Sequence, residues 1–241
     1  MNGAAAPFPN LANAALSGLS IGDVEPVIQL VETFFGDMPV RAVQYANENS
    51  LRTSMDALWF HNPVHHCISE LRLVAYPNVV GAGRCKFADI FLPGVGESVV
   101  IPCLELKHAT LSALWRGMGD GTEGDELKFQ NLRDNLRNMG EEELLALKVK
   151  YQHSHNRVDT SIKKMLQDGT EQVREYLRLI RNGASEGQKR GVEDHRIKCE
   201  PGESTLFGYV VVCIGTTRVL ARKVASESGR SLFKVTHRNH K

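Results

Sequence analysis

Two apolar runs of strand length flank a short turn in the first half of the chain. The runs cover residues 88–92 and 99–107, and the segment between them begins Pro-Gly-Val-Gly, which is typical of a hairpin. Successive side chains of a strand point to opposite faces, so Glu105 and Lys107 share one face of the second run. The pattern therefore predicts a hairpin in which Asp89 of the first strand lies near these two charged side chains.

Burying these three charges without a compensating partner would be expensive, because isolated charges lose their solvation in an apolar environment. A divalent cation would offset that cost. The carboxylates of Asp89 and Glu105 and the carbonyl of Leu106 are hard oxygen ligands of the kind that Mg²⁺ prefers. Lys107 would then hold an attacking water or face the charge that develops on a phosphate. We therefore expect a Mg²⁺ site here, in which Mn²⁺ should substitute.

An Asp, a hairpin and then Glu-x-Lys resembles the core of the PD-(D/E)XK nuclease superfamily. The chain is more closely similar, over about residues 45–215, to a group of largely uncharacterised fungal proteins that contain this domain. The resemblance rests on Asn47-Glu48, Gly83-Arg84, Ala88-Asp89, Leu104-Glu105-Leu106-Lys107 and Glu171-Gln172-Val173, with Tyr176 further on. Ala88 stands where the superfamily's name has Pro, a difference that removes no metal ligand.

The resemblance implies a catalytic set that extends beyond the hairpin. Glu48, on a preceding helix, would complete the metal shell formed by Asp89, Glu105 and the Leu106 carbonyl. Gln172, on a later helix, would orient Lys107 or the attacking water. Residue 70 is also a glutamate, and it lies in the strand expected before the hairpin. The sequence leaves open whether Glu48 or Glu70 is the additional acid.

Hydrophobic periodicity predicts a matching order of elements without the motif. The expected elements are helices at 23–35, 39–59 and 159–181 and strands at 67–75, 84–92, 99–107 and 205–215. A helix that returns to an apolar strand forms a crossover unit, which predicts that the last strand is parallel to the Glu-x-Lys strand. We therefore expect an α/β fold with a restriction-endonuclease-like core of a helix, a three-stranded antiparallel meander, a helix and a parallel strand.

Two additions to this core are expected. Residues 1–36 would be an N-terminal leader and helix, because about the first 22 residues are rich in Ala, Asn, Gly and Pro and look poorly ordered. Residues 37–241 would be the nuclease-like domain, with a helical insertion at about 117–157. The helices of that insertion are expected at 125–139 and 141–152.

Composition is typical of a globular intracellular protein. The chain has 241 residues, of which 42% are hydrophobic and 24% charged, enough to bury a full core. No apolar run approaches the roughly 20 residues of a membrane span, and the start MNGAAAPFPN lacks the parts of a signal peptide. The five cysteines form no Cys-x-x-Cys pair, which favours reduced thiols. We expect a nuclear or cytoplasmic protein with no membrane partner.

The net charge of +1 does not by itself indicate nucleic-acid binding, but its distribution is uneven. From residue 216 onward there are seven Lys or Arg residues and one acid, Glu227. Such a run is usually a solvated face, and the alternative is a surface that meets phosphates. We expect the nucleic-acid backbone to contact Arg84 and Lys86 and, from this flank, Arg218, Arg222 and Lys223.

These features together predict a metal-dependent nuclease that hydrolyses DNA phosphodiester bonds. One alternative is a catalytically inactive nuclease-like module that binds nucleic acid or protein, because fold does not dictate function. Another is an RNA-directed nuclease, since the proposed chemistry acts on the phosphate. The motifs of a P-loop and of a nucleophile elbow are absent from the sequence. Endonuclease and exonuclease modes, and a homodimer, are left open.

Overall fold

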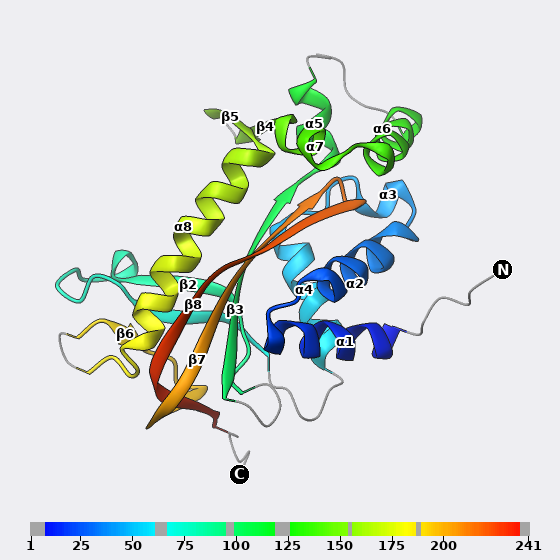
Figure 1. Cartoon of the computed structure of the whole chain (residues 1–241). Helices are drawn as coiled ribbons and strands as arrows, with labels where there is room; N and C mark the ends of the chain where they lie inside the picture. Colours follow the sequence, from blue (N-terminus) through cyan, green and yellow to red (C-terminus); the bar gives the residue numbers. More distant parts are fainter. Residues whose placement is uncertain are drawn as a thin grey trace, which may run out of the picture.

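The structure, a computed structural model, describes residues 8–60, 67–94, 99–118, 126–153, 156–186 and 189–236. It is an α/β fold built on a mixed six-stranded sheet with the strand order β6-β1-β2-β3-β7-β8 (Figure 1). The strands are β1 (Ile68–Val74), β2 (Cys85–Phe91), β3 (Val100–Ala109), β6 (Gly191–Val192), β7 (Ile197–Ile214) and β8 (Arg218–Val235). The expected α/β class is confirmed.

Strands β3 and β7 of the sheet run parallel. Their register extends from Val100 opposite Thr205 to Ala109 opposite Ile214, and the other neighbours in the sheet are antiparallel. The parallel strand predicted after the long helix is therefore confirmed. Strands β7 and β8 form a long ribbon that projects beyond the rest of the sheet (Figure 1).

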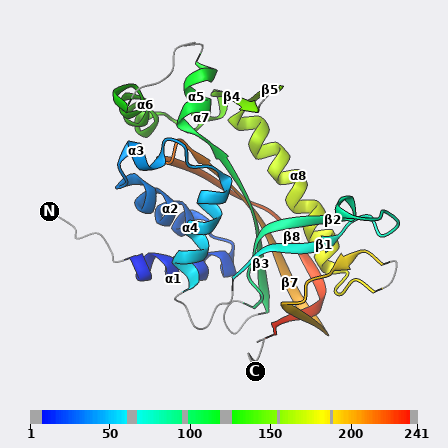
Figure 2. The ribbon, with the colours of Figure 1, turned by 180° about the vertical axis from the view of Figure 1, so that it is seen from behind.

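Helices cover both faces of the sheet. They are α1 (Phe8–Ile21), α2 (Glu25–Gly36), α3 (Val40–Val43), α4 (Glu48–Phe60), α5 (Leu111–Gly117), α6 (Glu126–Asn138), α7 (Glu141–Ala146) and α8 (Ile162–Arg181). Helices α1, α2 and α4 pack on one face and α8 on the other, as both views of the ribbon show (Figures 1 and 2). This two-sided burial explains the near-continuous apolar run in β7. None of the described helices is both long and apolar enough to cross a membrane.

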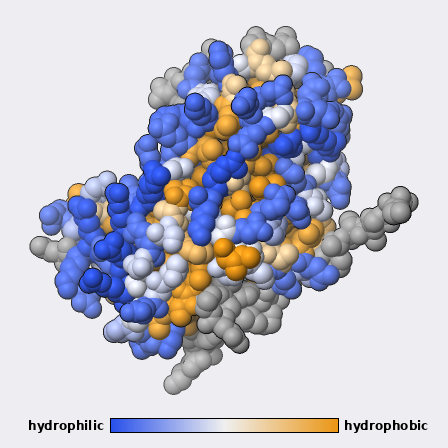
Figure 3. Space-filling model, in the orientation of Figure 1, coloured by the Kyte–Doolittle hydropathy of each residue, from blue (hydrophilic) through white to orange (hydrophobic). Residues whose placement is uncertain are grey.

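Helix α8 is amphipathic along its whole length. Its apolar side chains face the sheet, while hydrophilic side chains cover its outer side (Figure 3). The helix begins where the Ser161 hydroxyl accepts a hydrogen bond from the Lys164 N–H, a capping interaction. Gly169 does not break it. A Cβ atom at Gly169 would lie 2.5 Å from Cγ2 of Val210, so the glycine allows α8 to contact β7 closely.

The expectation of a poorly ordered leader is wrong for residues 8–21, which form α1. Ala12, Ala15, Leu16 and Leu19 of this helix are buried in the core that also contains α2 and α4. Small apolar residues at helical spacing therefore pack closely in a segment whose composition suggested a leader. Residues 1–7 of the expected leader lie outside the described residues.

Two expected helices end differently from the prediction. The helix expected at 39–59 is divided into α3 and α4, because the side chain of Asn47 accepts a hydrogen bond from the Ser50 N–H and starts a new helix. The helix expected at 141–152 ends at Ala146. The chain then forms a two-stranded hairpin of β4 (Lys148–His153) and β5 (Asn156–Ser161). The insertion is thus part helix and part strand.

A buried arginine joins the insertion to the N-terminal helices. Arg133 of α6 is 2% exposed, and its guanidinium donates to the main-chain carbonyls of Phe35, Gly36 and Met38 and to the Thr217 hydroxyl. These acceptors include carbonyls at the end of α2, which have no partner within the helix. The contact fixes α6 against the end of α2.

We expect Gly208→Ala to destabilise the protein, because side chains of α8 pack directly against this glycine of β7. A Cβ atom at Gly208 would lie 2.3 Å from Cγ1 of Val173 and 2.9 Å from Cδ1 of Leu177. Overpacking of this kind costs about 1–3 kcal/mol, measurable by denaturant unfolding. Gly36→Ala is the control, since a Cβ there meets nothing within 4 Å. Equal stability of the two variants would contradict the close approach of α8.

Candidate active site

The site is built on the place where β2 and β3 separate. The two strands pair only at Ile90 with Leu104 and at Phe91 with Cys103, and β3 then continues to Ala109 alongside β7. The Leu106 N–H, which a neighbouring strand would otherwise bind, donates to Oδ2 of Asp89 at 2.7 Å. The Asp89 carboxylate therefore takes the place of the departing strand.

The Leu106 carbonyl opens toward the same gap. In an extended strand the N–H and C=O of one residue point to the same edge, as the paired bonds of an antiparallel ladder require. Because the Leu106 N–H points to Asp89, its carbonyl also points away from β7. The geometry thus brings a carboxylate and a main-chain carbonyl together at the end of the β2–β3 ladder.

Glu105 and Lys107 lie together beside this gap, as their shared face predicts. Lys107 Nζ donates to Oε1 of Glu105 at 2.6 Å, and the Glu105 side chain is only 4% exposed. Lys107 Nζ also lies 4.0 Å from Oε2 of Glu48, which is in the first turn of α4. Helices α4 and α8 lie on either side of β3 here (Figure 2). Side chains from both faces of the sheet therefore meet where the strands part.

The contacts of Arg52 distinguish Glu48 from Glu70, the two candidates for the additional acid. Its Nη1 lies 2.8 Å from Oε1 of Glu70 and 3.8 Å from Oδ1 of Asp89. Glu70 has a left-handed backbone, with φ of 52°, and its side chain is 56% exposed. The structure brings Glu48 to Lys107 and pairs Glu70 with Arg52. Arg52 was not predicted, although its position four residues after Glu48 on one helix face was a usable signal.

Gln172 lies on the face of α8 that meets the cluster. One turn earlier, a Cβ atom at Gly169 would lie 3.7 Å from Cγ of both Glu105 and Lys107, and one turn later Tyr176 interacts with Glu105. Residues three and four apart share a helix face, so Gln172 faces the same way. Its Oε1 is buried and accepts no hydrogen bond from the described residues. Tyr176 is part of the pattern shared with the nuclease-like proteins, but no role at the site was predicted for it.

The electrostatics of the cluster reflect burial of several acids together. Burial, followed by repulsion from Asp89, raises the pKa of Glu105 to about 8 despite the adjacent Lys107. Burial likewise raises the pKa of Asp89 and of Glu48. For Lys107, burial lowers the pKa, but Glu105, Glu48 and Asp89 together outweigh it and hold the Lys107 pKa above its ordinary value. The ammonium group is therefore charged at neutral pH.

Two of the predicted phosphate-binding residues lie on β2 and the turn before it. Lys86, three residues before Asp89, forms an ion pair with Glu175 of α8. Arg84 Nη2 donates to Oε1 of Glu193 at 3.0 Å. Both cations therefore already have carboxylate partners.

The other three predicted phosphate-binding residues lie on β8 and contact the protein itself. Arg218 donates to three main-chain carbonyls at the end of α6, and Arg222 pairs with Glu141 of α7. Lys223 Nζ lies 3.2 Å from the centre of the Phe207 ring. The structure does not bring these residues to the carboxylate cluster, and their contacts account for them as packing groups.

The donor set fits a hard divalent cation. Oε2 of Glu105 is buried and has no hydrogen-bond partner among the described residues, which leaves an acceptor for a cation to satisfy. Asp89, Glu105 and the Leu106 carbonyl supply oxygen only, as Mg²⁺ requires. In the described part of the chain, no three His, Cys, Asp or Glu side chains already converge as a metal site. Of the three acids expected to bind metal, Asp89 and Glu105 lie near the gap, and Glu48 lies beyond Lys107.

Comparison with known proteins gives no further guide to this site. No family model, no curated protein and no solved structure matches the chain.

The raised pKa of Glu105 predicts how stability depends on pH. The unfolded chain releases this proton near pH 4.5 and the folded chain near pH 8, so between these values the folded state binds more protons. Stability therefore falls as pH rises through this window. Glu105→Gln keeps the neutral form, and we expect its free energy of unfolding to fall less steeply than that of the wild type between pH 5 and 8.

The measurement is urea unfolding at several pH values in EDTA. Glu142→Gln, at an exposed position of α7, is the control and should follow the wild-type pH dependence. Parallel curves for wild type and Glu105→Gln would show that burial does not hold the Glu105 proton.

Proposed function

We propose that this chain is a metal-dependent nuclease that hydrolyses phosphodiester bonds of DNA. The observation that carries the proposal is the gap at the end of the β2–β3 ladder. There Asp89, Glu105 and the Leu106 carbonyl meet beside a charged Lys107. An acidic, oxygen-lined gap with one adjacent ammonium group suits a divalent cation and a phosphate together.

The arrangement of elements supports a restriction-endonuclease-like core as the finer description of the fold. Helix α4, the β1-β2-β3 meander, helix α8 and the parallel strand β7 follow the predicted order. On this view α1 to α3 are an N-terminal extension and the segment from α5 to β5 is the insertion. The candidate residues all lie on core elements, where packing fixes their positions.

Mg²⁺ would be held by Asp89, Glu105 and the Leu106 carbonyl, with Glu48 as the additional acid. When bound, the ion supplies Lewis-acid chemistry at a phosphate group. The pKa of Glu105 is raised in part by repulsion from Asp89, and a cation between the two carboxylates would remove that repulsion. Glu48 fits the role of the additional acid better than Glu70 does, because Glu70 already forms an ion pair with Arg52.

Lys107 acts as a charged positioning group and not as a base. Its pKa is raised, so it carries no free lone pair at neutral pH. Its three N–H donors can orient a water molecule and face the negative charge that develops on the phosphate. The buried, unpartnered Oε1 of Gln172 is an acceptor suited to orienting that water or Lys107. By resemblance to the superfamily, cleavage would leave a 5′ phosphate.

We expect the purified protein to nick supercoiled plasmid DNA in Mg²⁺ or Mn²⁺ and to lose this activity in EDTA. Lys107→Ala should reduce cleavage at least 100-fold, because it removes the charge that meets the transition state. The measurement is conversion of supercoiled to open-circular DNA on gels. Circular dichroism of Lys107→Ala establishes that the fold is retained.

Lys163→Ala is the matched control, since Lys163 is an exposed lysine of α8 outside the cluster. It should cleave at the wild-type rate. A single-stranded RNA substrate in parallel identifies an RNA-directed enzyme. Salt-sensitive DNA binding without cleavage by the wild type would overturn the proposal in favour of an inactive binding module.

A further inference from the structure

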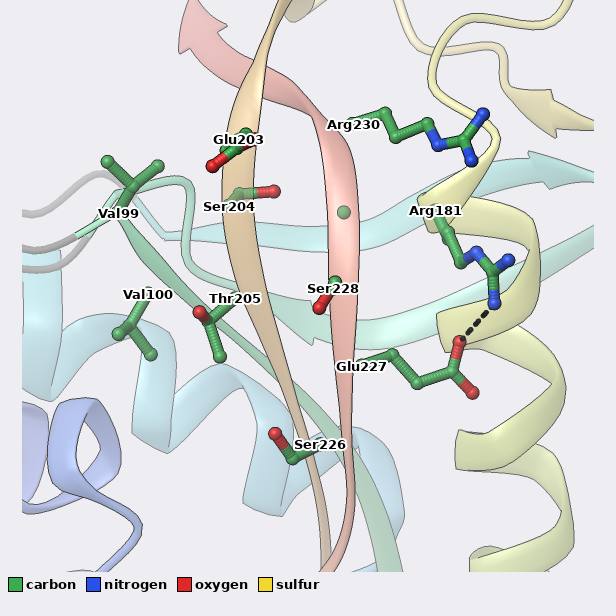
Figure 4. A pocket seen from close by; sticks show the side chains of 11 residues that line it. Val99, Val100, Arg181, Glu203, Ser204, Thr205, Ser226, Glu227, Ser228 and Arg230 are labelled. Atoms are coloured by element: carbon green, nitrogen blue, oxygen red, sulfur yellow. Dashed lines mark ion pairs between the residues drawn. The ribbon is translucent and has the colours of Figure 1, made fainter.

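A polar hollow lies where the end of α8 passes the β7–β8 ribbon (Figure 4). Its volume is about 770 Å³, within the range of small-molecule sites. Val100 of β3 lines it, five residues before Glu105, which corresponds to about 17 Å along an extended strand. The candidate nuclease residues are not part of its lining. The hollow is therefore a separate feature of the molecule.

Arginine side chains form one end of this hollow. Arg181 is the last residue of α8, and Arg230 reaches toward it from β8 (Figure 4). The same two residues also line an adjoining hollow of about 550 Å³, together with Asn182, Lys189 and Arg190. No carboxylate lines this second hollow among the described residues. Four cationic side chains thus surround one continuous polar surface.

Most of this positive charge is not balanced within the described chain. Arg181 has an ion pair, in which its Nη1 lies 3.7 Å from Oε2 of Glu227. The side chains of Lys189, Arg190 and Arg230 form no ion pair with the described residues. The end of α8 adds only about half a negative charge. Several cations that face one another are stabilised by an anion with more than one charge, and guanidinium groups bind phosphate with two parallel hydrogen bonds.

Hydroxyl groups form the opposite end of the first hollow. Ser226 and Ser228 are two residues apart on β8 and so share one face, and Thr205 of β7 lies across from them (Figure 4). The Glu203 carboxylate is on the same side. Glu227, between the two serines, points to the other face and pairs with Arg181, so the hollow extends around β8, the edge strand of the sheet. Hydroxyl and carboxylate oxygens at this end can bind the hydroxyl or amino groups of a ligand, which phosphate alone does not have.

We propose that the two hollows bind a phosphorylated nucleoside. Its phosphates would lie between Arg181, Arg230 and Arg190 on the α8 side of β8. Its sugar or base would pass over the free edge of this strand at Gly229 to the hydroxyls on the other face. Two sources share this chemistry, a free nucleotide and the 5′-phosphorylated end of a nucleic-acid strand. The proposal does not depend on the nuclease assignment, because it rests on different residues.

Calorimetric titration of the full chain with AMP, ADP, ATP and pyrophosphate, in low salt with EDTA, tests the site. The chelator keeps metal out of the candidate active site. We expect affinity to increase with the number of phosphates and ADP to bind more tightly than pyrophosphate. Arg230→Ala should weaken nucleotide binding at least tenfold, whereas Ser228→Val should weaken ADP binding and leave pyrophosphate binding unchanged.

Arg178→Ala is the matched control, because Arg178 is an exposed arginine one turn before Arg181 and does not line either hollow. It should change affinity less than twofold. Oligonucleotides of one sequence with a 5′ phosphate or a 5′ hydroxyl distinguish the two sources. Tighter binding of the 5′-phosphorylated oligonucleotide supports a strand end as the ligand, and equal binding of the two supports a free nucleotide. No binding of any probe, or equal weakening by Arg178→Ala, would overturn the site.

Discussion

The candidate active site depends on the hydrogen bond from the Leu106 N–H to the Asp89 carboxylate. A β-strand that loses its neighbour leaves main-chain groups without partners, and buried groups of this kind cost about 1–3 kcal/mol each. Asp89 is the residue of β2 next to the paired positions Ile90 and Phe91, and its carboxylate satisfies the N–H of Leu106. The opening between the strands therefore leaves no unpaired N–H at Leu106. It gives Glu105 and Lys107 a space that a complete ladder would close.

The opening holds more acids than cations in the absence of any ligand. Glu48, Glu70, Asp89 and Glu105 contribute four potential negative charges, while Lys107 and Arg52 contribute two positive ones. Because the pKa of Glu105 is about 8, it holds a proton at neutral pH, and one of the other three acids is left without a compensating charge. In the proposed function, a divalent cation would replace the Glu105 proton and balance all four acids, which would remove the cost of burying uncompensated charge.

The elements buried on two faces were the most predictable part of the fold. Strands β3 and β7 and helix α8 have strong apolar patterns, and their parallel connection follows from chain handedness. The boundaries of α4 and the formation of α1 depend on other interactions. Asn47 caps α4 and divides a segment whose apolar pattern is continuous, and α1 is a helix because Leu16 and Leu19 find a core to enter. Apolar periodicity alone does not give the first outcome, because the Asn47 cap is a local polar signal, and the second outcome depends on a core that forms only in the folded chain.

The same distinction applies to the charged residues. Glu105 and Lys107 were predictable as neighbours because strand geometry fixes residues two apart on one face. The basic C-terminal flank gave no such constraint: Arg218 is used to bind carbonyls of α6, whereas Arg230, from the same flank, meets Arg181 of α8 beside an open hollow. Charge counts along a sequence cannot separate a cation with an internal partner from one that faces solvent. That separation comes from tertiary packing, which here assigns one arginine to structure and leaves the other available to bind an anion.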